Sequence, residues 1–206
     1  MSTAELPPEV AAWLENPPTA EEMVKGQRQE AEDLIRKLRE LGAQSRVIDA
    51  DEFWAVSNRA SRVYGPWLLL ETALCRVVSD QTLAEVIGEV WSTAEYPQRA
   101  LRLVDWLWLF GKAGYTHDGK PASRPTASVT LYRGAPPQYC RRMSWTSDRA
   151  VAERFALNGM RGRHRGFVYQ TEAPPTALLC FNGENNGCDE SEYVINPAGL
   201  KITRAR

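Results

Sequence analysis

The fold is decided where the sequence changes from a helical to an extended pattern, at residues 128–134, which read Ser-Val-Thr-Leu-Tyr-Arg-Gly. This stretch is short, rich in β-branched and aromatic residues and closed by a glycine, as is typical of a β-strand. Further segments of the same type follow, over 166–171, 177–181 and 193–195. One helical segment, 148–157, interrupts them, with Asp148 as its expected N-cap. These residues predict mainly antiparallel strands with one inserted helix.

Residues 19–112, upstream of this change, have an almost entirely helical pattern. Thr19 and Glu22 form a capping box that opens the first helix, and Gly42 is a natural end for it. Asp80 is the expected N-cap of a later one. Apolar residues at helical spacing predict four further helices, over 49–63, 67–78, 80–91 and 98–110.

A loop rich in glycine and proline, between residues 111 and 125, separates the two patterns. The chain therefore divides into a Pro-rich N-terminal segment (1–18), a helical region (19–112), a linker (113–127) and a β-rich core (128–206). The predicted fold class is α+β, with an all-helical region in front of a small β-core.

The composition is that of an ordinary globular protein. The chain has 206 residues, of which 43% are hydrophobic and 25% charged, and its net charge is −1. These values argue against a disordered chain and against general binding to nucleic acid or membrane surfaces. The charge is uneven, because residues 128–206 hold 11 basic and 7 acidic side chains, against 14 and 19 in residues 1–127. We therefore expect an anionic ligand in the C-terminal part.

Cysteine usage and the apolar segments indicate where the protein acts. The four cysteines form no C-x-x-C pair and there are only two histidines, so we expect reduced thiols and no metal site. Residues 1–18 lack the basic start and apolar core of a signal peptide, and the most apolar stretch, 101–110, is too short to span a bilayer. A cytoplasmic, monomeric protein without membrane contact is expected.

Three short motifs carry the candidate chemistry, and their order is informative. Tyr132-Arg133-Gly134 lies at the end of the first predicted strand, and Ser144-Trp145-Thr146 runs from a strand into a helix. Glu190-Ser191-Glu192 opens the last strand. Because side chains two positions apart on a strand point to the same face, both glutamates are expected to face one cleft.

In this order the motifs resemble those of the mono-ADP-ribosyltransferases of the Arg–Ser–Glu class, whose carboxylate pair has the form Glu-x-Glu. The likeness runs from about residue 129 to residue 203, and this region is also similar to uncharacterised actinobacterial and actinophage proteins. The resemblance implies a small, mostly antiparallel two-sheet β-core that binds NAD as co-substrate. It also implies transfer of ADP-ribose to an acceptor, with protein arginine as the acceptor expected for Glu190.

The chemistry of this reaction gives each motif residue an expected role. Arg133 would bind the NAD pyrophosphate, since a guanidinium matches phosphate geometry. Glu192 would stabilise the oxocarbenium-like transition state, and Glu190 would orient or deprotonate the acceptor. Ser144 would hold Glu192 and the ribose by hydrogen bonds, and Thr146 would support the strand.

An aromatic side chain must cover the nicotinamide ring, and Phe155 is the first candidate. It lies eleven residues after Ser144, as the stacking phenylalanine does in some toxins of the class. Trp145 and Tyr132 are the other candidates, and Gly134 completes the Tyr-Arg-Gly strand end. A plain core role for Phe155 is compatible with the same sequence.

Several alternatives stay open at this point. Each motif alone also fits a structural role, as a strand end, a helix-cap region or solvated acid. The acceptor can be a nucleic-acid base or a small molecule, the reaction can be NAD hydrolysis by a toxin, or the fold can be an inactive partner-binding module. The protein can be a toxin, a phage effector or a regulator, and a toxin would need an antitoxin or inhibitor. The basic loop 161–166 can contact NAD or acceptor, or be solvated surface.

Overall fold

The computed structural model describes residues 19–94, 96–158, 166–183 and 190–205. The N-terminal segment 1–18, nearly all of the basic loop 161–166 and Cys188 lie outside these residues. The helices of the described part are α2 (Ala20–Ala43), α3 (Ala50–Ser57), α4 (Gly65–Leu74), α5 (Asp80–Thr93), α6 (Pro97–Ala100), α7 (Leu103–Ala113) and α8 (Arg149–Asn158). The strands are β1 (Thr116–His117), β2 (Lys120–Pro121), β3 (Val129–Ala135), β4 (Ser144–Thr146), β5 (Phe167–Ala173), β6 (Leu178–Asn182), β7 (Glu192–Ile195) and β8 (Thr203–Arg204).

The predicted helical region is present, but the boundaries of its helices differ from the expected ones. The capping box of Thr19 and Glu22 is confirmed. Helix α5 is capped by Ser79, one residue before the expected Asp80, because the Ser79 hydroxyl accepts the backbone N–H of Thr82 at 3.0 Å. The helix expected over 98–110 is two helices, since the chain is extended at Leu101 between α6 and α7.

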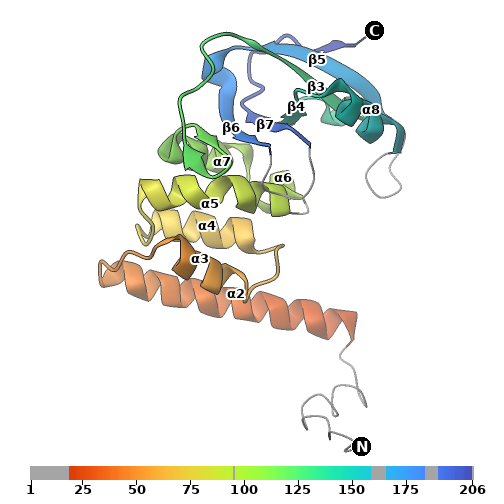
Figure 1. The fold of residues 1–206 in the computed structure, drawn as a ribbon. Coiled ribbons are helices and arrows are strands. Elements are labelled where there is room, and N and C mark those ends of the chain that lie inside the picture. The colour runs from red at the N-terminus through yellow and green to blue at the C-terminus, as the bar shows by residue number, and fades with distance from the viewer. Residues whose placement is uncertain (1–18, 95, 159–165, 184–189, 206) are drawn as a thin grey trace, which may run out of the picture.

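Figure 1 shows the helices α2 to α5 stacked in successive layers beneath the sheet, with α6 and α7 next to it and α8 beside β3 and β4. A first apolar cluster fills the helical layers and continues into the sheet through Met143, Leu179, Cys180 and Val194. The helical region and the β-core are therefore packed on a shared core, which brings α5 against the strands.

In the described residues, the β-core is a single eight-stranded mixed sheet, in the order β2-β1-β6-β7-β4-β3-β5-β8. The expectation of two sheets is therefore wrong. Strand β4, only three residues long, pairs with both β3 and β7 and joins what would otherwise be two separate groups of strands. Residues 116–121, expected in a linker, add β1 and β2, and β1 pairs in parallel with β6.

Successive side chains of strand β7 point to opposite faces of the sheet, and this alternation sets the direction of Glu192. Val194 packs in the cluster shared with the helices, whereas Ile195 packs in a second cluster with Leu131, Trp145 and other residues of the opposite face. Glu192, two positions before Val194, therefore faces the helices. Among the described residues, no helix is long and apolar enough to cross a membrane.

Candidate functional site

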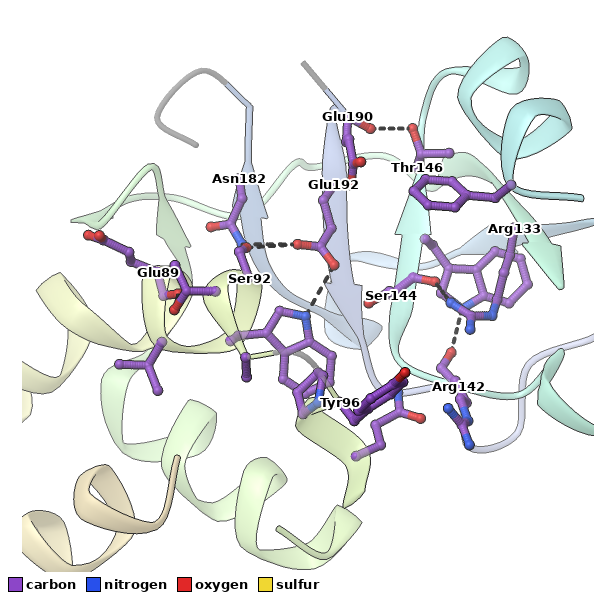
Figure 2. Close-up of a pocket in the computed structure, with 18 of the residues that line it drawn as sticks. Glu89, Ser92, Tyr96, Arg133, Arg142, Ser144, Thr146, Asn182, Glu190 and Glu192 are labelled. Carbon is purple, nitrogen blue, oxygen red and sulfur yellow. Dashed lines mark hydrogen bonds between the residues drawn. The ribbon is translucent and has the colours of Figure 1, made fainter. Parts of the chain in front are cut away.

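A cavity of about 940 Å³ lies between the helical region and the sheet. Its walls come from α3, α5 and α6 on one side and from β3, β4, β7 and α8 on the other. The volume is at the upper end of the roughly 300–1,000 Å³ found for ligand pockets. Figure 2 shows Glu192 near the middle of this cavity, with Arg133 and Arg142 on one side of it and Glu89 on the other.

Strand register brings the middle of the site together. Glu192 on β7 is opposite Thr146 on β4 and Asn182 on β6. Thr146 is in turn opposite Tyr132 on β3. Paired residues of antiparallel strands have their side chains on the same face, so this row spans four strands at the cavity. Residues from three distant sequence motifs thus meet through β-pairing.

The Glu192 carboxylate is half-buried and accepts three hydrogen bonds. The Trp91 indole Nε1 donates to Oε1 at 3.1 Å, the Ser92 hydroxyl donates to Oε2 at 2.9 Å, and the Asn182 Nδ2 donates to Oε2 at 3.4 Å. The expectation that Ser144 holds this glutamate is not met, because Ser144 is not among its donors in the described part of the chain. Helix α5 supplies two of the three donors instead.

Glu190 also lines the cavity, but it lies before β7 and not in it. Ser191 between the two glutamates has a φ of 43°, in the left-handed region, so a turn and not strand alternation relates them. The Thr146 hydroxyl donates to the Glu190 carbonyl at 2.7 Å and fixes this turn to β4. Burial, followed by the nearby charge of Glu192, raises the pKa of Glu190.

Arg133 is held at the cavity wall by backbone carbonyls. Its Nε donates to the Tyr139 carbonyl at 3.0 Å and its Nη1 donates to the Ser144 carbonyl. These bonds use two of the five guanidinium donors. Burial, followed by the nearby guanidinium of Arg142, lowers the pKa of Arg133 to about 10, so the group is still protonated at neutral pH. The two cations form one positively charged end of the cavity.

The remaining predicted site residues divide between the cavity and the core. Tyr132 and Phe155 line the cavity and are partly exposed there. Trp145 also borders the cavity, but it is only 2% exposed and packs in the second cluster, and its indole N–H donates to the Arg142 carbonyl at 2.7 Å. Its geometry therefore leaves the ring little surface for stacking on a ligand.

Gly134 has a packing role that the motif alone did not indicate. A Cβ added at Gly134 would lie 1.9 Å from the Ala152 carbonyl oxygen and 2.5 Å from the Ala156 nitrogen. Helix α8 therefore rests directly on β3 at this glycine. Since α8 also holds Phe155, the close approach sets the position of this aromatic wall of the cavity.

Sequence reasoning missed the contribution of the helical region to the site. Trp91, Ser92, Tyr96 and Glu89 line the cavity from this region, and Asn182 and Arg142 line it from the β-core. Trp91 and Ser92 sit on a helix with an ordinary amphipathic pattern, so no local signal marks them. Asn182 could have been found from its place at the end of a predicted strand.

The described residues contain no group of three or more His, Cys, Asp or Glu side chains that could hold a metal ion. No protein-family model matches the sequence. Comparisons with curated proteins and with solved structures give no match either.

Proposed function

We propose that this protein is a mono-ADP-ribosyltransferase that transfers ADP-ribose from NAD to an acceptor and releases nicotinamide. The observation that carries the proposal is that Arg133, Ser144 and Glu192, from three separate motifs, line one cavity of suitable size. The cavity lining includes the cations Arg133 and Arg142, together with Arg62, and the carboxylates Glu190 and Glu192, together with Glu89. NAD combines an anionic pyrophosphate with a ribose that becomes cationic in the transition state. A site for NAD therefore needs cations for the pyrophosphate and a carboxylate for the ribose.

In the proposed reaction the bond between the nicotinamide nitrogen and the ribose carbon breaks, and the bonding electrons leave with nicotinamide. Glu192 stabilises the positive charge that develops on the ribose. The acceptor nucleophile then forms a bond to the same ribose carbon and loses a proton to Glu190. The raised pKa of Glu190 supports this role, because it makes the carboxylate a better proton acceptor.

We further propose that the acceptor is a macromolecule, with a protein arginine favoured because a carboxylate at Glu190 suits a cationic guanidinium. The enzyme would act in the cytoplasm of the producing cell or of a phage-infected host. The unpaired thiols of Cys75, Cys140 and Cys180 support a reducing compartment.

The test is nicotinamide release from NAD by the purified protein, with and without cell lysate as a source of acceptor. We expect release by the wild type and a loss of at least 100-fold in Glu192→Gln, in line with the loss of a transition-state electrostatic contact. Glu172→Gln is the matched control, since this exposed glutamate of β5 accepts a hydrogen bond from the Thr130 hydroxyl at 2.7 Å, away from the cavity lining.

The acceptor is tested with labelled NAD and Glu190→Gln. If Glu190 serves the acceptor, this variant loses labelling of protein while nicotinamide release with water as acceptor largely persists. The absence of release by folded wild-type protein, even with lysate, would exclude the proposed activity.

A further inference from the structure

We infer that helix α5 is part of the active site, with Trp91 and Ser92 acting together with Asn182 as positioning residues for Glu192. The inference rests on the proposed function and extends it to the helical region, for which the motifs assigned no role. Figure 2 shows Ser92 and Asn182 beside Glu192 on the side of the cavity away from Arg133.

Both carboxylate oxygens of Glu192 accept hydrogen bonds. Oε1 accepts the Trp91 indole N–H, and Oε2 accepts the Ser92 hydroxyl and the Asn182 amide. A carboxylate bound through one oxygen can still rotate, whereas donors on both oxygens fix its plane. Because hydrogen bonds to an ionised acceptor are stronger than those between neutral groups, each donor contributes to this orientation.

The Trp91 donor is itself held in place by the core. Trp91 is 1% exposed and packs edge-on against Trp106 with ring centroids 4.9 Å apart, and against Phe110 at 6.0 Å. Its indole N–H therefore has a direction set by the core of the helical region. The core packing of α5 and α7 thus determines where the Glu192 carboxylate lies.

Asn182 joins helix α5 to strand β7. Its Nδ2 lies 3.3 Å from the Gly88 carbonyl oxygen, 2.9 Å from the Ser92 hydroxyl oxygen and 3.4 Å from Glu192 Oε2. The two amide hydrogens are shared among these three acceptors. A Cβ at Gly88 would lie only 2.6 Å from the Asn182 Oδ1, so the glycine permits the close approach of α5 to β6.

In the described part of the chain, the hydrogen bonds to Glu192 leave its negative charge uncompensated by a salt bridge. The three donors are neutral, and among the described residues Glu192 forms no ion pair. A contact with Lys or Arg would have cancelled much of its negative charge. Neutral donors hold the carboxylate in place and leave that charge to act on a developing cation.

The experiment measures the kinetics of nicotinamide release in Ser92→Ala, Asn182→Ala and Ser92→Thr, with Gln81→Ala as control. Gln81 is exposed at the first turn of the same helix and bonds Glu85 at 3.2 Å. We expect Ser92→Ala and Asn182→Ala to lower kcat roughly 10- to 100-fold, the range that corresponds to a hydrogen bond with a charged group, and to change KM for NAD less than about twofold. Ser92→Thr keeps the hydroxyl and should recover most of the rate.

A spectroscopic arm tests the contact without relying on turnover. The indole ¹H–¹⁵N resonance of Trp91, assigned by its loss in Trp91→Phe, should move in Glu192→Gln and stay in place in Glu172→Gln. The size of the shift reports the exchange of a charged acceptor for a neutral one at Nε1.

The outcomes separate this inference from the proposed function. Normal kcat in Ser92→Ala and Asn182→Ala, or a rise in KM alone, would overturn the positioning role while leaving the transferase proposal intact. An unmoved Trp91 resonance would overturn it independently of any activity. If the wild type releases no nicotinamide although the Trp91 resonance moves, the proposed function fails, and the positioning role for that reaction fails with it.

Discussion

The Trp91 indole on helix α5 donates a hydrogen bond of 3.1 Å to the Glu192 carboxylate on strand β7, across 101 positions of the chain. Trp91 belongs to the largest apolar core of the molecule, and Glu192 lies at the cavity that the three motifs line. One hydrogen bond therefore couples the packing of the helical region to the geometry of the proposed catalytic carboxylate.

Asn182→Asp tests whether nicotinamide release needs the Asn182 amide, because this substitution nearly keeps the shape of the side chain and changes its charge. Asn182→Asp puts a second carboxylate where the Nδ2 now lies 3.4 Å from Glu192. Like charges at this distance repel, and the donor to the Gly88 carbonyl is also lost. We expect nicotinamide release at neutral pH to fall at least tenfold, with partial recovery in acid. A rate equal to that of the wild type at pH 7 would show that the amide is not needed.

The two glycines Gly88 and Gly26 give opposite predictions for the same substitution in a helix. The Cβ added in Gly26→Ala has no atom within 4 Å, so this substitution at an exposed position should stabilise helix α2 by about 0.5–1 kcal/mol. Gly88→Ala should not raise the free energy of unfolding in this way, and it should lower the turnover of NAD. The reason is that its Cβ displaces Asn182, which is hydrogen-bonded to Ser92. Urea unfolding and the nicotinamide assay measure both effects, and equal behaviour of the two variants would contradict the prediction.

Gly134→Ala should destabilise the β-core by about 1–3 kcal/mol or more, since its Cβ would overlap backbone atoms of α8 that cannot rotate away. Gly111→Ala, in α7, is the matched control, because no atom lies within 4 Å of its added Cβ. The free energy of unfolding from urea titration checks the pair. A loss of less than about 0.5 kcal/mol in Gly134→Ala would mean that α8 does not rest on β3 this closely.

The positively charged end of the cavity should bind the diphosphate of ADP-ribose through Arg133 and Arg142. Arg142→Gln removes one cation and should weaken ADP-ribose binding by roughly tenfold, since a charged hydrogen bond contributes about 1.5–3 kcal/mol. Arg36→Gln, exposed on α2, controls for the change in net charge. Calorimetric titration with ADP-ribose measures the affinity, and an unchanged dissociation constant in Arg142→Gln would exclude this residue from the ligand site.

The raised pKa of Glu190 predicts a pH dependence of stability. Because the folded protein holds this proton more tightly than the unfolded chain, the contribution of Glu190 is fully present below its ordinary pKa of about 4.5. That contribution is lost as the pH rises from this value through the raised folded pKa. The difference in unfolding free energy between Glu190→Gln and wild type should therefore grow in favour of the variant over this window. Urea unfolding at a series of pH values measures both free energies. If they changed with pH in parallel, the prediction would be wrong.

Much of the architecture was readable from local pattern. The capping box at Thr19, the helical region, the strand that contains Arg133 and the helix that begins after Asp148 follow from turn chemistry and from the spacing of apolar residues. These features depend on neighbours within a few positions, and the sequence records such neighbours directly. The motif residues that line the cavity were also identifiable, because strand ends and glycine marked them.

The pairing of strands and the partners of Glu192 depended on contacts between distant parts of the chain. Nothing in Ser144-Trp145-Thr146 shows that these three residues join two groups of strands into one sheet. Trp91 and Ser92 have no motif, and only the packing of α5 on β6 and β7 brings them to the carboxylate. The sequence by itself thus determined the residue types available for the chemistry. The tertiary structure decided which of them meet, because hydrophobic burial and strand register act over separations that local pattern does not record.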